Sequence, residues 1–291
     1  MANPWILAAR PPTLWAAVAP VLVAAGVAIG DNAFRSDAFT AALAGAVAIQ
    51  VAANFANDAS DAARGADTDD RIGPQRAVAS GLLTSREMWT GVVMSFAVAA
   101  AAGVYLTVIA GWVVIAIGVA SVAAALTYVG GPIPYGYRGL GELFVFVFFG
   151  LVATVGSRYV HDQTAPAEIW FLSVPMGLLV TAILVANNVR DIETDAGAGK
   201  RTLAVIMGRR PTVALYGTLI YGAFLAVATL AAIGATSRWT ALALVALPLG
   251  VPLVRTVRST TAGPALITVL KGTARLQVVV GVLLAVGAAI S

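Results

Sequence analysis

Long uncharged stretches divide the chain into segments that have the length of a membrane helix. Pro11–Gly30 and Ala38–Asn57 carry no charge, and Met88–Tyr137 is long enough for two helices with a break near Gly111. A transmembrane helix needs about 20 mostly apolar residues. The other candidates are Leu140–Ser157, Glu168–Asn188, Pro211–Ile233, Trp239–Val254 and Gly272–Ile290. The pattern predicts an all-α polytopic membrane protein, with nine transmembrane helices around a central apolar chamber in a single domain, 1–291.

The composition supports this class. Of the 291 residues, 59% are hydrophobic and 11% are charged, whereas soluble domains carry roughly 25% charged residues. The formal charge of +4 does not indicate a nucleic-acid partner, because the charges lie in loops and at the ends of apolar runs. The absence of cysteine excludes disulfides, thiol nucleophiles and Cys-ligated metals. The single histidine, His161, is expected beside Asp162 in a solvated turn.

The distribution of basic residues predicts the orientation. Nine spans leave two alternating sets of loops, and one set holds only Arg35, Arg158 and Arg238 of the 18 Lys and Arg residues. The loops rich in Lys and Arg stay in the cytoplasm. We therefore expect a plasma-membrane protein with a cytoplasmic N-terminus. The polar loops at about 57–87, 129–138 and 188–210 then lie together on the cytoplasmic side.

The second predicted span ends in a stripe of amides and carboxylates. Gln50, Asn54, Asn57, Asp58 and Asp61 follow one another at helical spacing, so they share one face. Because a charge at the bilayer centre costs about 2.5–3.5 kcal/mol, the carboxylates are expected at the interface or in a cavity.

A similar stripe closes the sixth span. Asn188, Asp191 and Asp195 share a face, and Asn187 stacks on Asp191 one turn later. In the simplest interpretation, both clusters are solvated loop charges neutralised by nearby arginines. Their pairing favours a function instead, because carboxylates from two helices suit Mg²⁺, which usually takes one or two carboxylates together with substrate phosphate oxygens. The basic residues that would hold such a polyanion are Arg64, Arg71, Arg76, Lys200 and Arg201. Acidic cluster, basic cluster and apolar chamber together indicate a lipid diphosphate.

The two stripes belong to a set of sequence blocks that resembles the UbiA superfamily of intramembrane prenyltransferases. The similarity is greatest to the branch that prenylates 1,4-dihydroxy-2-naphthoate in menaquinone synthesis, and it covers roughly residues 7–210. The matching blocks are Ala9–Thr13, Asn57–Asp67, Arg71–Gly81, Gly130–Glu142, Asn187–Asp191 and Gly199–Val205.

The resemblance implies roles for the individual residues. Asp58, Asp61, Asp191 and Asp195 would be the catalytic carboxylates that bind magnesium and diphosphate. Asn54 and Asp67 are further candidate metal ligands. The wider superfamily often has an acidic residue at the position of Gly65, and in this sequence the acidic residue, Asp67, comes two residues later. The candidate diphosphate-binding residues are Arg64, Arg71, Arg76, Lys200, Arg201, Asn57, Asn187 and Asn188.

The resemblance also implies an anionic aromatic acceptor whose carboxylate leaves as CO₂. Arg138, with Tyr128 and Tyr137, is the first candidate to bind it, and Arg10 is the alternative. Other enzymes of the superfamily use hydroxybenzoate, homogentisate or porphyrin acceptors. A cation-binding transporter is the alternative from another class. It would require polar residues along a path through the membrane, and away from the cytoplasmic ends the spans contain little beyond Ser, Thr, Tyr and Gln50.

Overall fold

The computed structural model describes residues 3–65, 73, 76–131 and 134–290, and this part of the chain is helical without any strand. Within these residues, eight helices are long and apolar enough to cross a membrane. They are α2 (Pro11–Gly30), α3 (Ser36–Ala63), α4 (Ser85–Ala110), α6–η2–α7 (Gly141–Asp162), α8 (Ala167–Arg190), α11 (Arg209–Ala232), η3–α12 (Arg238–Ser259) and α13 (Gly263–Ala289). In the two composite spans, α6 is Gly141–Val145, α7 is Ala153–Asp162, η3 is Arg238–Ala246 and α12 is Leu247–Ser259. The prediction of an all-α membrane protein is confirmed.

One predicted span is short. The helix α5 (Val113–Thr127) has 15 residues, which gives about 22 Å against a hydrocarbon core of about 30 Å. The uncharged sequence continues to Tyr137, but the chain leaves the helix after Thr127 and enters a loop with several Gly and Pro residues. Eight spans are therefore supported by length and composition, and α5 stays a predicted ninth.

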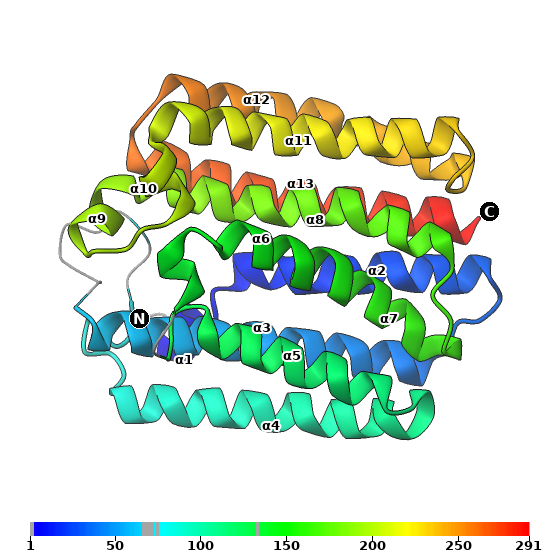
Figure 1. Cartoon of the computed structure of the whole chain (residues 1–291), viewed down its shortest axis with the longest axis horizontal. Coiled ribbons are helices and arrows are strands. Elements are labelled where there is room, and N and C mark those ends of the chain that lie inside the picture. Colours follow the sequence, from blue (N-terminus) through cyan, green and yellow to red (C-terminus); the bar gives the residue numbers. More distant parts are fainter. Residues whose placement is uncertain (1–2, 66–72, 74–75, 132–133, 291) are drawn as a thin grey trace.

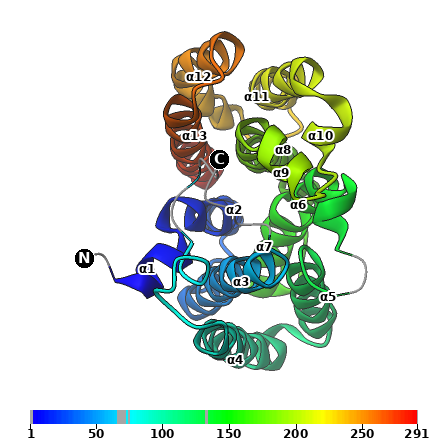
Figure 2. The same ribbon diagram turned by 90° about the vertical axis from the view of Figure 1, so that its left-hand side faces the viewer.

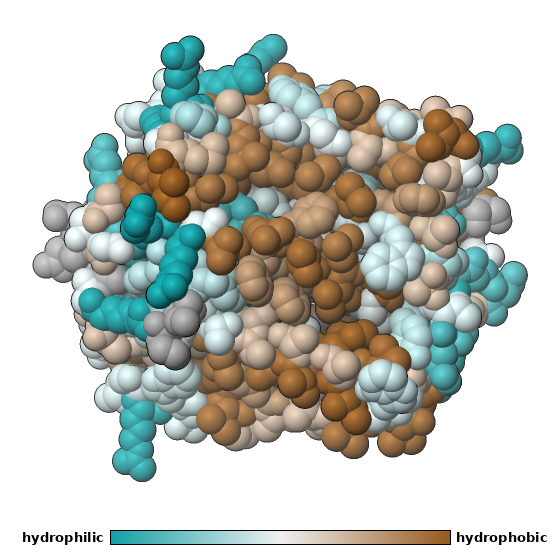
Figure 3. All heavy atoms as spheres, in the orientation of Figure 1, coloured by the Kyte–Doolittle hydropathy of each residue, from teal (hydrophilic) through white to brown (hydrophobic). Residues whose placement is uncertain are grey.

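The helices run side by side along one direction, and the two chain ends lie at opposite ends of the bundle (Figure 1). The end that carries the loops after α3 and α8 is called the motif end below. It also holds four short helices: α1 (Pro4–Ala9), η1 (Tyr135–Arg138), α9 (Ile192–Gly197) and α10 (Leu203–Met207). Hydrophobic residues cover the middle of the face in Figure 3, and hydrophilic ones gather toward both ends.

The largest apolar core lies to one side of the bundle. It joins α2, α8, α11, η3, α12 and α13, with Leu172, Ile220 and Leu276 almost fully buried in it. Seen along the bundle, α3, α5 and α7 lie on the other side of α2 and α8 (Figure 2). The tight packing of one half therefore leaves the other half to form the chamber.

The helix α6–η2–α7 contains a π-helical segment, η2 (Phe146–Val152), where it meets α8. A Cβ atom on Gly150 would lie 2.5 Å from the Cα of Gly177, so the two backbones touch through glycines. Small residues allow this approach between membrane helices. The contact fixes α8 beside the chamber.

The prediction of a solvated turn is wrong for His161, whereas Asp162 is exposed at the end of α7. Arg158 is 1% exposed and binds the carboxylates of Asp31 and Asp162, both at 2.6 Å. His161 is also buried, and its Nδ1 accepts the backbone N–H of Arg35 at 3.0 Å. Ion pairing and a backbone donor compensate for burial, and a single sequence shows neither.

Candidate active site

A cavity of about 380 Å³ lies between α2, α3, α5, α6–η2–α7 and α8. This volume is within the usual range for small-molecule sites. Apolar and small side chains form most of its wall, among them Ala46, Gly118, Phe148 and Val152. Both predicted motifs reach this one chamber. Its polar lining consists of Arg10, Thr13, Gln50, Asn54, Asn57, Asp61, Arg76, Asn187, Asn188, Asp191, Asp195 and Lys200, together with tyrosine, serine and threonine side chains.

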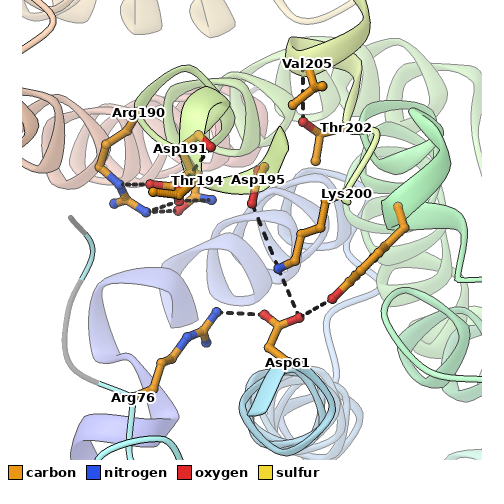
Figure 4. A network of polar contacts seen from close by, with 11 residues as sticks. Asp61, Arg76, Arg190, Asp191, Thr194, Asp195, Lys200, Thr202 and Val205 are labelled. Atoms are coloured by element: carbon orange, nitrogen blue, oxygen red, sulfur yellow. Dashed lines mark hydrogen bonds and ion pairs between the residues drawn. The ribbon is translucent and has the colours of Figure 1, made fainter. Parts of the chain in front are cut away.

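Asp61 is the centre of the polar network in Figure 4. Its side chain is 3% exposed, and it pairs with Arg76 at 3.1 Å and Lys200 at 3.0 Å. The hydroxyl of Tyr137 also donates to it at 2.8 Å. Burying a carboxylate is expensive unless cations and donors surround it, and here three groups from three segments do so.

Lys200 connects the two motifs. Its Nζ lies 3.0 Å from Asp61 Oδ1 and 4.0 Å from Asp195 Oδ1. The ammonium group therefore stands where carboxylates of the two motifs face each other, a place that suits a cation. The tight turn through Gly199, which has a φ of 72°, directs Lys200 to this position, since a positive φ favours glycine.

Asp191 has a partner that the sequence analysis missed. Arg190 donates to both of its oxygens, at 2.6 and 2.5 Å, and also to Asn187 Oδ1 at 2.9 Å. Successive residues of a helix do not face each other, so this pair was not expected. It forms because α8 ends at Arg190 and Asp191 leaves the helical conformation.

Asn188 also has a partner that the sequence did not indicate. Its amide donates to Glu142 at 2.9 Å, and both residues are buried. The bond joins α8 to the start of α6 beneath the motif end. In the sequence, Glu142 is the last residue of the block Gly130–Glu142, and nothing in that block predicts a hydrogen bond to Asn188.

The role predicted for Asp58 requires correction. Its two carboxylate oxygens accept the backbone N–H groups of Ala77 and Val78 at 3.1 and 3.0 Å, and the residue is 1% exposed. It is not among the residues that line the chamber. Asp58 therefore fixes the segment after Arg76 to α3, and its oxygens are occupied away from the chamber. Its distant partner is a backbone segment, which the motif does not reveal.

Asn54 also differs from its predicted role as a metal ligand. Its amide nitrogen donates to the carbonyl of Ala9 at 2.9 Å and to the hydroxyl of Thr13 at 3.0 Å. Its oxygen accepts the amide of Gln50 at 3.3 Å. These bonds tie α3 to the start of α2 and occupy both ends of the amide.

Three of the predicted basic residues lie outside the chamber wall. Arg64, Arg138 and Arg201 are exposed. Arg64 donates to the carbonyl of Gly131 at 3.1 Å and lies 5.2 Å from the ring centre of Tyr137. Arg138 is thus displaced as the first candidate for the acceptor carboxylate, because it is exposed and does not line the chamber, although its neighbour Tyr137 does. Arg10, the alternative, lines the chamber.

Two other candidates, Asp67 and Arg71, lie outside the described residues. Their predicted contacts with metal and diphosphate stay predictions.

The two candidate tyrosines line the chamber. Burial, followed by the charge of Asp61, raises the pKa of Tyr137 above its ordinary value. Burial, followed by the charge of Glu142, does the same for the pKa of Tyr128. Both phenols therefore stay neutral hydrogen-bond donors at physiological pH.

The remaining oxygen atoms of the motifs fit magnesium. Asn57 Oδ1 is buried without a hydrogen-bond partner among the described residues, and Asn57, Asp61, Asp191 and Asp195 all line the chamber. Within the same residues, no three acidic or histidine side chains are grouped closely enough to hold a metal alone. Such a set matches Mg²⁺, because substrate phosphates and water usually complete its six oxygen ligands.

An apolar chamber that is closed by two acidic motifs and surrounded by helices of membrane length suits an intramembrane transferase of isoprenoid groups. The family model described as the UbiA prenyltransferase family matches residues 17–270. The chain belongs to this family.

The chain is similar to several proteins within this family. The chain is 44% identical over 269 residues to the 1,4-dihydroxy-2-naphthoate octaprenyltransferase of Mycobacterium tuberculosis, covering 92% of this chain and 91% of that protein. It is 34% identical to the Escherichia coli protein of the same name, covering 87% and 84%. A UbiA homologue from Archaeoglobus fulgidus, bound to GPP and Mg²⁺, shares the fold with a TM-score of 0.67 at 15% identity, covering 96% and 98%.

Proposed function

We propose that the protein transfers a polyprenyl group from polyprenyl diphosphate to 1,4-dihydroxy-2-naphthoate. Diphosphate and CO₂ are lost, and the product is demethylmenaquinol, a step of menaquinone synthesis. The observation that carries the proposal is the meeting of Asp61 and Asp195 across Lys200 at an apolar chamber. The names of relatives that align with most of this chain support the choice of acceptor.

The residues at the motif end would bind the donor by its diphosphate. Lys200 and Arg76 supply positive charge inside the chamber, where charge developing on the leaving diphosphate is stabilised most strongly. Asn57, Asp61, Asp191 and Asp195 would hold Mg²⁺, which supplies further neutralisation of that charge. Breaking the allylic C–O bond leaves an electron-poor carbon. The apolar wall excludes water that would otherwise capture this carbon.

The acceptor ring then forms the new carbon–carbon bond. The carbon that bears the carboxylate lies ortho to a hydroxyl and is electron-rich, so its electron pair attacks the allylic carbon. The bond to the carboxylate breaks next, CO₂ leaves, and the electron pair restores aromaticity. Arg10 is our candidate to hold the carboxylate, since it reaches the chamber and Arg138 does not.

The proposed function also requires a membrane location and an orientation. We propose that residues 1–291 form a single multi-pass domain of the plasma membrane, with the motif end in the cytoplasm. Arg35 precedes α3, Arg158 lies in α7 and Arg238 begins η3, at the ends of these elements that are opposite the motifs. This distribution supports the proposed orientation, because the loops with few basic residues lie outside the cytoplasm.

The proposal is tested with purified protein in lipid nanodiscs, labelled polyprenyl diphosphate and a panel of aromatic acceptors. We expect prenylated product with dihydroxynaphthoate, complete loss of turnover with a chelator, and recovery on addition of excess Mg²⁺. Dihydroxybenzene and hydroxybenzoate acceptors serve as controls for ring specificity. Robust turnover with 4-hydroxybenzoate and none with dihydroxynaphthoate would place the protein in another branch of the family.

A further inference from the structure

Gln50 presents a hydrogen-bond acceptor to the chamber that no group among the described residues uses. Gln50 lies on α3 and lines the chamber, and it is 8% exposed. Its Oε1 is buried without a hydrogen-bond partner among the residues that the structure describes. An unsatisfied buried acceptor costs roughly 1–3 kcal/mol, so its presence requires a reason.

The orientation of this amide is set by a chain of bonds that starts at the protein backbone. The carbonyl of Ala9 can only accept, so the group of Asn54 that faces it must be the NH₂. The oxygen of Asn54 then faces Gln50, whose NH₂ must donate to it. The other atom of the Gln50 amide, the oxygen, is left toward the chamber.

The position of Gln50 separates it from the diphosphate site. Asn57 and Asp61 follow it on α3 by 7 and 11 residues, which places them about 10 and 16 Å further along the axis toward the motif end. Apolar side chains such as Ile49 and Phe148 line the chamber as well. A neutral acceptor in apolar surroundings suits an O–H donor on a flat aromatic ring better than a phosphate or a metal.

We infer that Gln50 Oε1 accepts a hydrogen bond from a phenolic hydroxyl of the aromatic acceptor, and thereby positions its ring below the diphosphate. This inference rests on the proposed function and adds a specificity-determining residue to it. A site that is built to bind a hydroxyl discriminates against an analogue that lacks it, because its buried polar group is then unpaired.

The test compares Gln50→Met with the wild type, since methionine preserves volume and removes the amide. Acceptors are 1,4-dihydroxy-2-naphthoate and its two monomethyl ethers, which keep an electron-rich ring and each lack one O–H. We expect Gln50→Met to raise the KM of the dihydroxy acceptor about tenfold, while the KM of polyprenyl diphosphate stays within twofold. For one of the two ethers, the KM in the wild type should already be about tenfold higher than that of the dihydroxy acceptor. For this ether, the KM in Gln50→Met should equal the KM in the wild type.

The matched control is Gln277→Met on α13. Gln277 is a fully buried glutamine whose side-chain amide also has no hydrogen-bond partner within the described residues, and it is not part of the chamber wall. Its acceptor KM should equal that of the wild type. An equal rise of KM for all three acceptors in Gln50→Met, or no rise at all, would overturn the inference. Failure of the wild type to prenylate dihydroxynaphthoate would instead overturn the proposed function.

Discussion

Asp61→Asn should lower kcat/KM by about a thousandfold, which is the upper range for loss of one electrostatic contact in a transition state. The carboxylate of Asp61 holds Arg76, Lys200 and Tyr137 at the chamber wall. An amide of the same size keeps the packing but removes the charge that orders the two cations and would bind Mg²⁺. The rate is measured with saturating Mg²⁺ at several donor concentrations.

The result has to be separated from loss of the fold, because removing one partner of a buried ion pair can destabilise a protein. Thermal unfolding and gel filtration of Asp61→Asn in detergent should therefore accompany the kinetics. Asp37→Asn is the matched control, since Asp37 pairs with Arg35 at the opposite end and is 40% exposed. It should retain at least half of the activity. A folded Asp61→Asn protein with near-normal kcat/KM would show that the network is structural.

Lys200→Met should lower kcat about a hundredfold and raise the KM of polyprenyl diphosphate. Lys200 reaches carboxylates of both motifs, and its ammonium would neutralise the departing diphosphate, a contribution of about 3 kcal/mol. The acceptor KM should change little, because the acceptor is expected deeper in the chamber. Steady-state kinetics with each substrate varied in turn separates the two effects.

The second lysine of the chain provides the control. Lys271 is exposed on α13 and does not line the chamber, so Lys271→Met should leave both KM values unchanged. A kcat for Lys200→Met within threefold of the wild type would remove Lys200 from the proposed diphosphate site.

Much of the fold was predictable because apolar runs have a fixed minimum length in a membrane. α2 has the predicted bounds, Pro11–Gly30. The last helix begins at Gly263, although Gly272 was predicted, because Lys271 interrupts the apolar run but is exposed on α13. Charge therefore marks the end of an apolar run in the sequence without ending the helix.

The site was predictable where helical spacing alone decides which side chains share a face. Asn57 and Asp61 reach the chamber as that spacing requires. Asp58 points to the backbone of 77–78 and Arg138 is exposed, because loop geometry decides both. Spacing along one helix holds no information about a partner segment. The pairing of Arg190 with Asp191 likewise depends on where α8 ends.

Decarboxylating prenyl transfer to dihydroxynaphthoate is tested most directly by one labelling experiment. Acceptor labelled in its carboxyl carbon is incubated with polyprenyl diphosphate, Mg²⁺ and purified protein, and both released CO₂ and prenylated product are counted. The proposed function predicts one labelled CO₂ for each molecule of product. Prenylated product that keeps the labelled carboxyl carbon would contradict it.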